Sequence, residues 1–210
     1  MAKFTKEYSS NVQKQDAEEY RDHRFSKNPD LIKLDQLEKK CVRSLLKLAS
    51  RGSLVLDIPC GTGRFHELMR EVGFKLIAAD ISKEMLAVAR ASGLAEDYLV
   101  ADAEKLQLPD KSVDGVCCIR LFHHIGSAEM RRNIFKEFAR VSRRWVLVSF
   151  YHSNCLKRFK KIIRGKPVSG EHVSYSALRA EASDAGLRPI KTAAVARYVR
   201  PQWFALFEVR

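Results

Sequence analysis

A glycine-containing turn directly after an apolar run is the first feature of this chain that suggests chemistry. Residues 54–65 read Leu-Val-Leu-Asp-Ile-Pro-Cys-Gly-Thr-Gly-Arg-Phe. Glycines after a buried strand permit a tight turn and let the backbone approach a ligand without an obstructing Cβ. His66 stands where a dinucleotide fingerprint needs its third glycine, and no Gly-Lys-Ser/Thr of a phosphate-binding loop follows. The turn therefore predicts a ligand-binding loop of another kind.

Three carboxylates follow three successive apolar segments. Asp57 lies just before the turn, Asp80 ends the next apolar run, and Asp102 follows the third. In open α/β sheets, ligands bind beyond the carboxyl ends of the strands, and an acid at the Asp80 position can accept both hydroxyls of a ribose. Asp102 and its neighbouring backbone groups could read the edge of an adenine. An unpartnered buried carboxylate is costly, so for Asp57 a binding role is favoured over that of a simple strand-end residue.

The elements that must position these residues alternate between short apolar runs and helical stretches. The predicted strands are residues 53–58, 75–80, 98–101, 113–119 and 145–151, and the predicted intervening helices are 63–72, 83–91 and 128–141. Helices are also predicted at 16–24, at 31–49 after the start signal Asn28-Pro29-Asp30, and at 175–185; strand-like runs at 190–199 and 203–209 suggest an antiparallel hairpin. The predicted fold is therefore α/β: a Rossmann-like, doubly wound, mostly parallel seven-stranded sheet with N-terminal capping helices and this hairpin at its edge.

The length of 210 residues suits one domain. We expect a helical cap over 1–50, a cofactor-binding core over 51–151, and an acceptor-side segment with the hairpin over 152–210. The five cysteines show no CxxC spacing, which favours a reducing cytoplasm over a disulfide framework or a zinc site. The N-terminal residues carry no apolar stretch typical of a secretory signal, and no apolar run approaches the roughly 20 residues that span a bilayer.

Taken in order and at their spacing, these motifs resemble the class I S-adenosylmethionine (SAM)-dependent methyltransferases, in particular the type 11 methyltransferase domain family shared with quinone-biosynthesis enzymes. The matching stretches are 55–65, 78–87, 102–116 and 121–125, with a weaker match at 175–186. The resemblance implies SAM as the cofactor, with Asp57 and Gly61 beside its methionine part, Asp80 on the ribose, and Asp102 and Ala103 at the adenine. It also implies a cofactor-binding role for Pro59, Gly63, Ile81 and Met85.

Two positions depart from the family pattern. Pro59 occupies the place of the family's first glycine, and because proline lacks an N–H, any cofactor contact by that amide is lost. Ser142-Arg143-Arg144-Trp145 replaces the usual Lys-Pro-Gly-Gly turn before the fifth strand. We expect the first change to leave the turn intact and the second to alter a surface turn.

His124 and His123 are the candidate catalytic residues, because they follow the fourth strand and histidine can take a proton near neutral pH. The resemblance supports a structural histidine bonded to backbone at least as well as a catalytic base, with His124 as the candidate. On an extended segment adjacent side chains point in opposite directions, so the pair cannot chelate one metal ion, and no metal site is predicted. Cys60 is expected to pack beneath the loop, and Cys117 and Cys118 to fill the core on opposite sides of a strand. By analogy to related enzymes, Tyr8, Tyr20 and Phe25 are candidate lid aromatics.

The formal charge of +13 is unevenly distributed. Residues 51–130 hold 9 basic and 12 acidic side chains, whereas residues 131–210 hold 18 and 5. Within the latter, Lys157–Lys166 combines six basic residues with helically spaced apolar ones, which is typical of a membrane-surface or anion-binding element, although a solvated helix face is the plain alternative.

The charge leaves three functions open. The resemblance favours a small or lipid-like acceptor and the charge an anionic one, with the protein in the cytoplasm or peripheral at a membrane. The alternatives are an RNA methyltransferase, acting on tRNA or rRNA through the basic third, and a non-catalytic cofactor-binding partner protein. The acceptor, the atom methylated and the oligomeric state are not determined by the sequence.

Overall fold

The computed structural model describes residues 28–49 and 53–210 of the chain. A central sheet with strand order β3-β2-β1-β4-β5-β8-β7 runs through it, and a two-residue strand, β6, pairs with the end of β5. The strands are β1 (Leu54–Asp57), β2 (Lys75–Asp80), β3 (Asp97–Val100), β4 (Val113–Cys118), β5 (Ser142–His152), β6 (His172–Val173), β7 (Leu187–Ala194) and β8 (Gln202–Val209). The helices are α3 (Pro29–Leu46), α4 (His66–Val72), α5 (Lys83–Arg90), α6 (Ala128–Val141), α7 (Leu156–Ile163) and α8 (Tyr175–Ser183), with a 3-10 turn, η1, at Phe122–His124.

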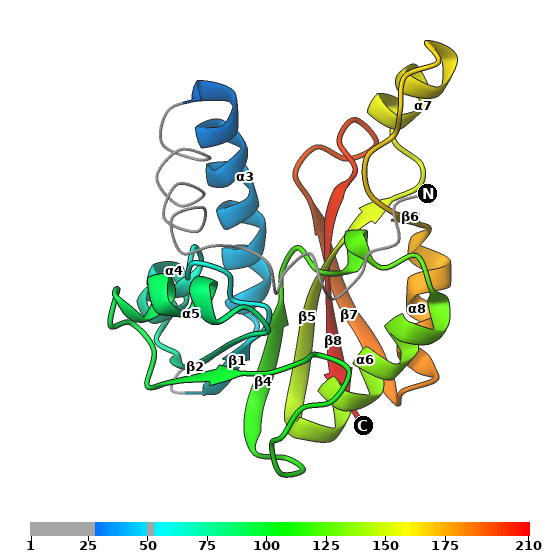
Figure 1. Cartoon of the computed structure of the whole chain (residues 1–210). Helices are drawn as coiled ribbons and strands as arrows, with labels where there is room; N and C mark the ends of the chain where they lie inside the picture. The colour runs from blue at the N-terminus through cyan, green and yellow to red at the C-terminus, as the bar shows by residue number, and fades with distance from the viewer. Residues whose placement is uncertain (1–27, 50–52) are drawn as a thin grey trace.

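The sheet is parallel from β3 to β5, and β8 and β7 add an antiparallel hairpin at one edge (Figure 1). The predicted fold class is thereby confirmed. Strand order reverses beside β1, because β2 and β3 extend the sheet to one side while β4 lies on the other. In such sheets the carboxyl ends at the reversal form the ligand site. The loops after β1 and β4 therefore mark the candidate ligand-binding edge of the sheet, which we call the functional edge.

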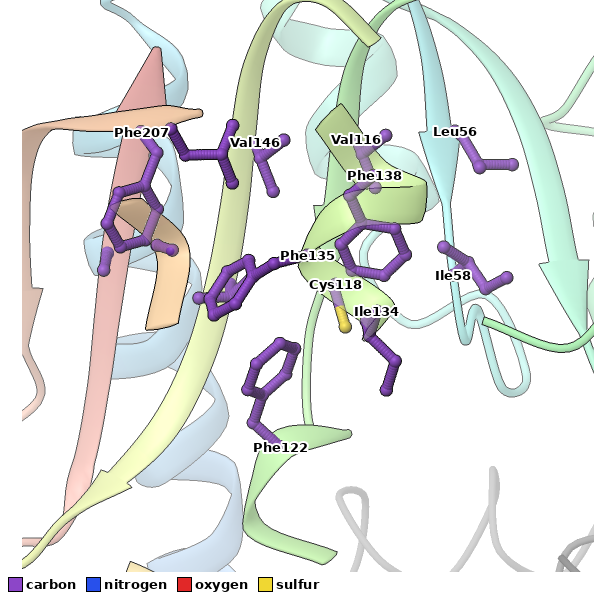
Figure 2. Close-up of a cluster of buried hydrophobic side chains, with 14 of the residues drawn as sticks. Leu56, Ile58, Val116, Cys118, Phe122, Ile134, Phe135, Phe138, Val146 and Phe207 are labelled. Atoms are coloured by element: carbon purple, nitrogen blue, oxygen red, sulfur yellow. The ribbon is translucent and has the colours of Figure 1, made fainter. Parts of the chain in front are cut away.

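Two hydrophobic cores cover the two faces of the sheet. One contains Phe122 and α6 residues at helical spacing, among them Phe135 and Phe138, which pack on Val116 and Val146 (Figure 2). The other packs α3 and α4 against the opposite face. Adjacent strand residues separate accordingly: Cys117 belongs to the α3/α4 core and Cys118 to the α6 core, both fully buried. The prediction that these cysteines fill the core on opposite sides is confirmed.

The helix after Asn28 begins as the start signal predicted. The Asn28 side chain accepts hydrogen bonds from the N–H groups of Asp30 and Leu31, and Pro29 opens the helix, where a missing N–H costs nothing. Among the described residues no helix is long and apolar enough to cross a membrane. The predicted helix at 16–24 and the lid candidates Tyr8, Tyr20 and Phe25 lie outside the described residues.

The last predicted strand pair is correct in kind but shifted in bounds. β7 begins at Leu187 and ends at Ala194, rather than covering residues 190–199. Pro189 is tolerated inside it because β7 is the edge strand and its register shifts between Pro189 and Lys191. The strand ends early because the chain turns before β8, with Tyr198 at a φ of 63°.

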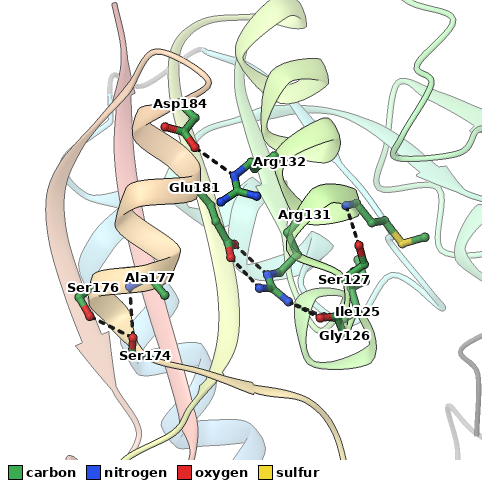
Figure 3. Close-up of polar contacts among 11 residues, drawn as sticks. Ile125, Gly126, Ser127, Arg131, Arg132, Ser174, Ser176, Ala177, Glu181 and Asp184 are labelled. Carbon is green, nitrogen blue, oxygen red and sulfur yellow. Dashed lines mark hydrogen bonds and ion pairs between the residues drawn. The ribbon is translucent and has the colours of Figure 1, made fainter. Parts of the chain in front are cut away.

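Helices α6 and α8 are joined by an ion pair with little solvent contact (Figure 3). Arg131 donates two hydrogen bonds to the Glu181 carboxylate, at 2.8 and 2.6 Å, and a third to the carbonyl of Ile125 at 2.8 Å. Paired charges of this kind avoid the large cost of an isolated buried charge. Through the Ile125 contact, the pair also fixes the turn that follows His123 and His124.

Candidate active site

The glycine turn after β1 has the backbone that a close ligand approach requires. Gly61 and Gly63 have φ values of 56° and 79°, a region that favours glycine. A Cβ on Gly61 would meet no atom within 4 Å, so this residue borders open space. A Cβ on Gly63 would lie 2.7 Å from Nδ1 of His66. Both the positive φ of Gly63 and the closeness of the His66 ring therefore favour glycine at this position. Helix α4 begins only at His66, after the turn, and not at residue 63 as predicted.

Asp80 holds the turn against β2. One carboxylate oxygen accepts a hydrogen bond from the Gly61 N–H at 2.8 Å, and the other accepts one from the Ser82 N–H at 2.9 Å. Burial raises the pKa of the Asp80 carboxyl, while the hydrogen bonds from Ser82 and Gly61 act in the opposite direction. Each carboxylate oxygen can accept more than one hydrogen bond, so acceptor capacity for a hydroxyl remains. This bracing role was not anticipated from the sequence.

Asp57 ends β1 in an almost fully buried position, 2% exposed. Its Oδ2 lies 3.3 Å from Nε2 of His66, which is itself completely buried. In the sequence, His66 was noted only because it replaces the third glycine of a dinucleotide fingerprint, and its contact with Asp57 was not predicted. A histidine on the first turn of the following helix folds back beneath the loop, and a helical reading of residues 63–72 could have suggested this neighbour.

The remaining loop residue, Cys60, packs beneath the turn as expected. Its side chain is 7% exposed in a small cluster with Ala78 and Leu86. Burial and the nearby Asp57 and Asp80 carboxylates raise the pKa of the Cys60 thiol well above its usual value. The neutral thiol that results is a poor nucleophile, so Cys60 is a packing residue.

A second brace holds the loop after β3. The side chain of Asp102 accepts a hydrogen bond from the Glu104 N–H at 3.0 Å, which forms a tight turn containing Ala103. From α6, Glu137 accepts a hydrogen bond from the Leu106 N–H at 2.8 Å, and Arg140 donates to the Leu108 carbonyl at 2.8 Å. The hydrogen bond from Arg140 lowers the pKa of Glu137.

A buried carboxylate joins α3 to the same edge. Glu38, fully buried on α3, lies 2.5 Å from an Arg64 nitrogen and 3.2 Å from an Arg120 nitrogen. Arg64 follows the glycine turn, and Arg120 follows β4 with a φ of 68°. Asp35, one turn earlier on α3, also pairs with Arg64 at 2.8 Å. The sequence did not predict this network, because helix α3, the glycine turn and the residue after β4 lie far apart along the chain.

His123 and His124 lie at the carboxyl end of β4, but in the 3-10 turn η1 rather than on an extended segment. The premise that their side chains point in opposite directions is wrong, because the turn brings the two ring centroids to 4.1 Å. Among the described residues, no group of three or more His, Cys, Asp or Glu side chains could hold a metal ion.

Aromatic residues from β5 and β6 complete this cluster. The His123 ring stacks on the Tyr151 ring with 4.2 Å between their centroids, and the centroids of the Tyr151 and His172 rings are 5.5 Å apart. The His123 carbonyl accepts a hydrogen bond from the Glu171 N–H at 2.7 Å. Burial lowers the pKa of His172 from its usual value, which favours the neutral imidazole. His123 is buried and His124 is exposed, which makes His124 the more accessible of the two.

The residues at this edge fit SAM in two respects. Gly61 borders open space at the switch point of the sheet, and Asp80 presents acceptor oxygens beside it. Pro59, Ile81 and Met85 lie on the same two loops and the start of α5, each partly buried. Contacts of the nine predicted cofactor residues with a bound cofactor stay predictions.

Comparison with known proteins agrees with this geometry. Residues 56–148 match the family described as "Methyltransferase domain". Malonyl-[acyl-carrier protein] O-methyltransferase of Yersinia pestis is 35% identical over 120 residues, covering 54% of this chain and 42% of that protein. Probable tRNA methyltransferase 9B of Mus musculus is 33% identical over 100 residues, covering 48% and 22%. The chain thus spans less than half the length of these relatives.

Among solved structures, the magnesium protoporphyrin IX methyltransferase of Synechocystis PCC 6803 with bound SAH superposes with a TM-score of 0.78. The match covers 97% of each chain at 18% sequence identity. This likeness extends the shared fold beyond residues 56–148 to the described C-terminal hairpin.

Proposed function

We propose that this chain is a class I SAM-dependent methyltransferase that transfers a methyl group to a small-molecule or lipid-like acceptor. The observation that carries the proposal is the braced glycine turn. Gly61 borders open space while its N–H is fixed by Asp80, so the loop is set before a ligand arrives. A preset site loses less conformational entropy on binding than a flexible one.

The cofactor, when bound, supplies a methyl group on a sulfonium that is already strongly electrophilic. The protein's task is then to align the acceptor with that methyl group and to exclude water. Asp80 would hold the ribose, the Asp102–Ala103 turn the adenine, and Asp57 the methionine end. Each role is inferred from resemblance together with position at the functional edge.

The cluster of His123, His124, Tyr151 and His172 would form the acceptor side. It lies after β4 and β5, on the same sheet edge as the glycine turn, and is rich in imidazoles. His124, being exposed, is our candidate to accept a proton from the acceptor, with His172 as a neutral alternative. Tyr151 would position His123 by ring stacking.

The similar proteins include one named for malonyl-[acyl-carrier protein] and one named for tRNA, so a second acceptor class needs separate mention. RNA is the alternative favoured by the charge of residues 131–210. RNA affinity should then fall steeply with salt, because neutralised phosphates release counterions. A non-catalytic partner protein is the third alternative, in which SAM binds without turnover.

One experiment separates these functions. The full chain is incubated with methyl-labelled SAM and, in separate reactions, with the small-molecule, lipid and RNA fractions of the source cell. Label in a small-molecule or lipid fraction supports the proposal, and label in RNA replaces it with the RNA reading. Calorimetric SAM binding with no labelled product in any fraction would favour the non-catalytic partner. His124→Ala and His172→Ala, assayed separately, then test the proton acceptor.

A further inference from the structure

Helix α7 differs from the other described helices in how it packs. Helices α3, α4, α5, α6 and α8 each bury residues in a core, whereas α7 buries none. It projects from the body beyond the end of β5 (Figure 1). Four large apolar side chains of α7 are 46–68% exposed: Leu156, Phe159, Ile162 and Ile163. Leaving such side chains in water brings no stability to the fold.

The turn between β7 and β8 extends this surface. The N–H groups of Leu156 and Lys157 donate hydrogen bonds to the carbonyls of Tyr198 and Val199. Tyr198 and Val199 are themselves 55% and 51% exposed. Six of the nine exposed large apolar side chains among the described residues thus lie in these two short segments. We call residues 156–166 and 197–200 together the basic–apolar tip.

The tip carries charge of one sign only. It contains eight basic residues and no acidic one: Lys157, Arg158, Lys160, Lys161, Arg164, Lys166, Arg197 and Arg200. The field of this cluster reaches nearby groups, since Arg158 and Lys161 contribute to lowering the pKa of His172, after the larger effect of burial. Basic side chains interleaved with exposed apolar ones are typical of elements that lie in a membrane interface.

We propose that the basic–apolar tip docks the protein on an anionic lipid surface. Anionic headgroups complement the eight cations, and the acyl boundary takes up Phe159, Ile162 and Ile163, which a nucleic acid would leave in water. RNA binding would favour exposed aromatic rings for stacking, whereas three of the four exposed α7 side chains are aliphatic. The charge suits either anionic partner, and the exposed aliphatic side chains favour lipid.

The position of the tip gives this docking a consequence for catalysis. Leu156 follows Tyr151 by five residues, and Tyr151 belongs to the acceptor-side cluster at the end of β5. Docking would therefore bring that cluster to the membrane interface, where a lipid-like acceptor resides. This consequence rests on the proposed function, whereas lipid binding itself does not.

The test is co-sedimentation of the full chain with large vesicles. Neutral phosphatidylcholine vesicles are compared with vesicles in which about a third of the lipid is phosphatidylglycerol, at about 0.1 M and 0.5 M salt. We expect about tenfold stronger binding to the anionic vesicles at the lower salt, reduced at the higher salt. Equal binding to both vesicle types, or none to either, would overturn the proposal.

Paired variants distinguish lipid docking from plain attraction between charges. Phe159→Ser combined with Ile163→Ser removes apolar contact, and Lys157→Gln combined with Lys160→Gln removes charge; each pair should weaken vesicle binding severalfold. The matched controls are Ile190→Ser, exposed on β7, and Lys75→Gln with Lys136→Gln, exposed elsewhere. Both controls should bind as the parent does. Circular dichroism of each variant verifies that it is folded.

Two further readouts complete the test. If the apolar pair leaves vesicle binding unchanged, or if a single-stranded RNA oligonucleotide binds while anionic vesicles do not, the lipid proposal is wrong. Calorimetric SAM binding is measured in parallel. If the parent chain binds SAM but not anionic vesicles, only the docking proposal is refuted. If it binds vesicles but not SAM, only the proposed function is refuted.

Discussion

The two halves of the functional edge treat polar groups in opposite ways. On the proposed cofactor side, the carboxylates Asp57, Asp80 and Glu38 are buried: Asp80 accepts backbone hydrogen bonds, Glu38 pairs with Arg64, and Asp57 lies 3.3 Å from Nε2 of His66. On the proposed acceptor side, the basic–apolar tip exposes basic and apolar side chains together. Buried charges are tolerated only when paired, whereas solvated ones need no partner. The buried carboxylates of the proposed cofactor side thus hold neighbouring segments in place, whereas the tip presents a surface that can contact another molecule.

The largest effect expected from this contrast follows the loss of the Glu38 charge. Glu38→Gln removes the buried negative charge that Arg64 and Arg120 share, although Arg64 keeps its pair with Asp35, and should lower the free energy of unfolding by about 3 kcal/mol. Urea denaturation measures it. Glu71→Gln is the matched control, since Glu71 of α4 also pairs with an arginine of α3, Arg43, but is about half exposed. Its loss should stay within about 1 kcal/mol. Equal losses would remove the distinction between buried and exposed pairs.

The next effect concerns cofactor affinity. Asp80→Ala removes the hydrogen bonds that fix Gly61 and Ser82, together with the predicted ribose contact. SAM binding should weaken by about 2 kcal/mol, as expected for charge-assisted hydrogen bonds. Titration calorimetry measures the change, with Asp97→Ala at the exposed start of β3 as the control. Unchanged affinity in Asp80→Ala would contradict the assignment of this carboxylate to the cofactor.

A smaller effect should depend on pH. Because Arg140 depresses the pKa of Glu137 in the folded state, the carboxylate stabilises the fold above its unfolded pKa, near the usual 4.5. That contribution is lost as pH falls through the folded pKa. Glu137→Gln should therefore be less stable than the parent near pH 7, by about 1 kcal/mol or less, and the difference should vanish at acidic pH. Thermal melts from pH 7 to about pH 3 follow both proteins. A constant difference across this range would show that Glu137 does not act through its charge.

The smallest effect on stability and on cofactor affinity is expected from substitutions in the tip. Neutralising Lys157, Arg158, Lys160 and Lys161 to Gln should change the free energy of unfolding by no more than about 0.5 kcal/mol per site, because exposed charges add little. Cofactor affinity should stay the same while use of the acceptor falls. Calorimetry and the labelled-methyl assay measure the two. If cofactor affinity fell as much as use of the acceptor, the tip would contribute to the cofactor site.

Much of the fold could be read from local patterns. Continuous apolar runs followed by Asp57, Asp80 and Asp102 predicted parallel strands and the edge at which they meet. Asn28-Pro29-Asp30 predicted a helix start, and the hairpin was expected from two strand-like runs. Such features depend on residues close together in the chain, so their physical cause is visible in the sequence. The conformation around His123 and His124 was not, because a 3-10 turn there is set by contacts with β5 and with the segment at Glu171.

By itself, the sequence determined the class of the domain, the order of its glycine turn and acids, and the concentration of positive charge in its last third. Only the tertiary structure decided which groups act as partners. It placed His66 beneath Asp57, closed Arg64 and Arg120 around Glu38, and joined the β7–β8 turn to α7 by two backbone hydrogen bonds. These pairings link segments far apart along the chain, and their energies depend on burial, which a linear pattern does not specify.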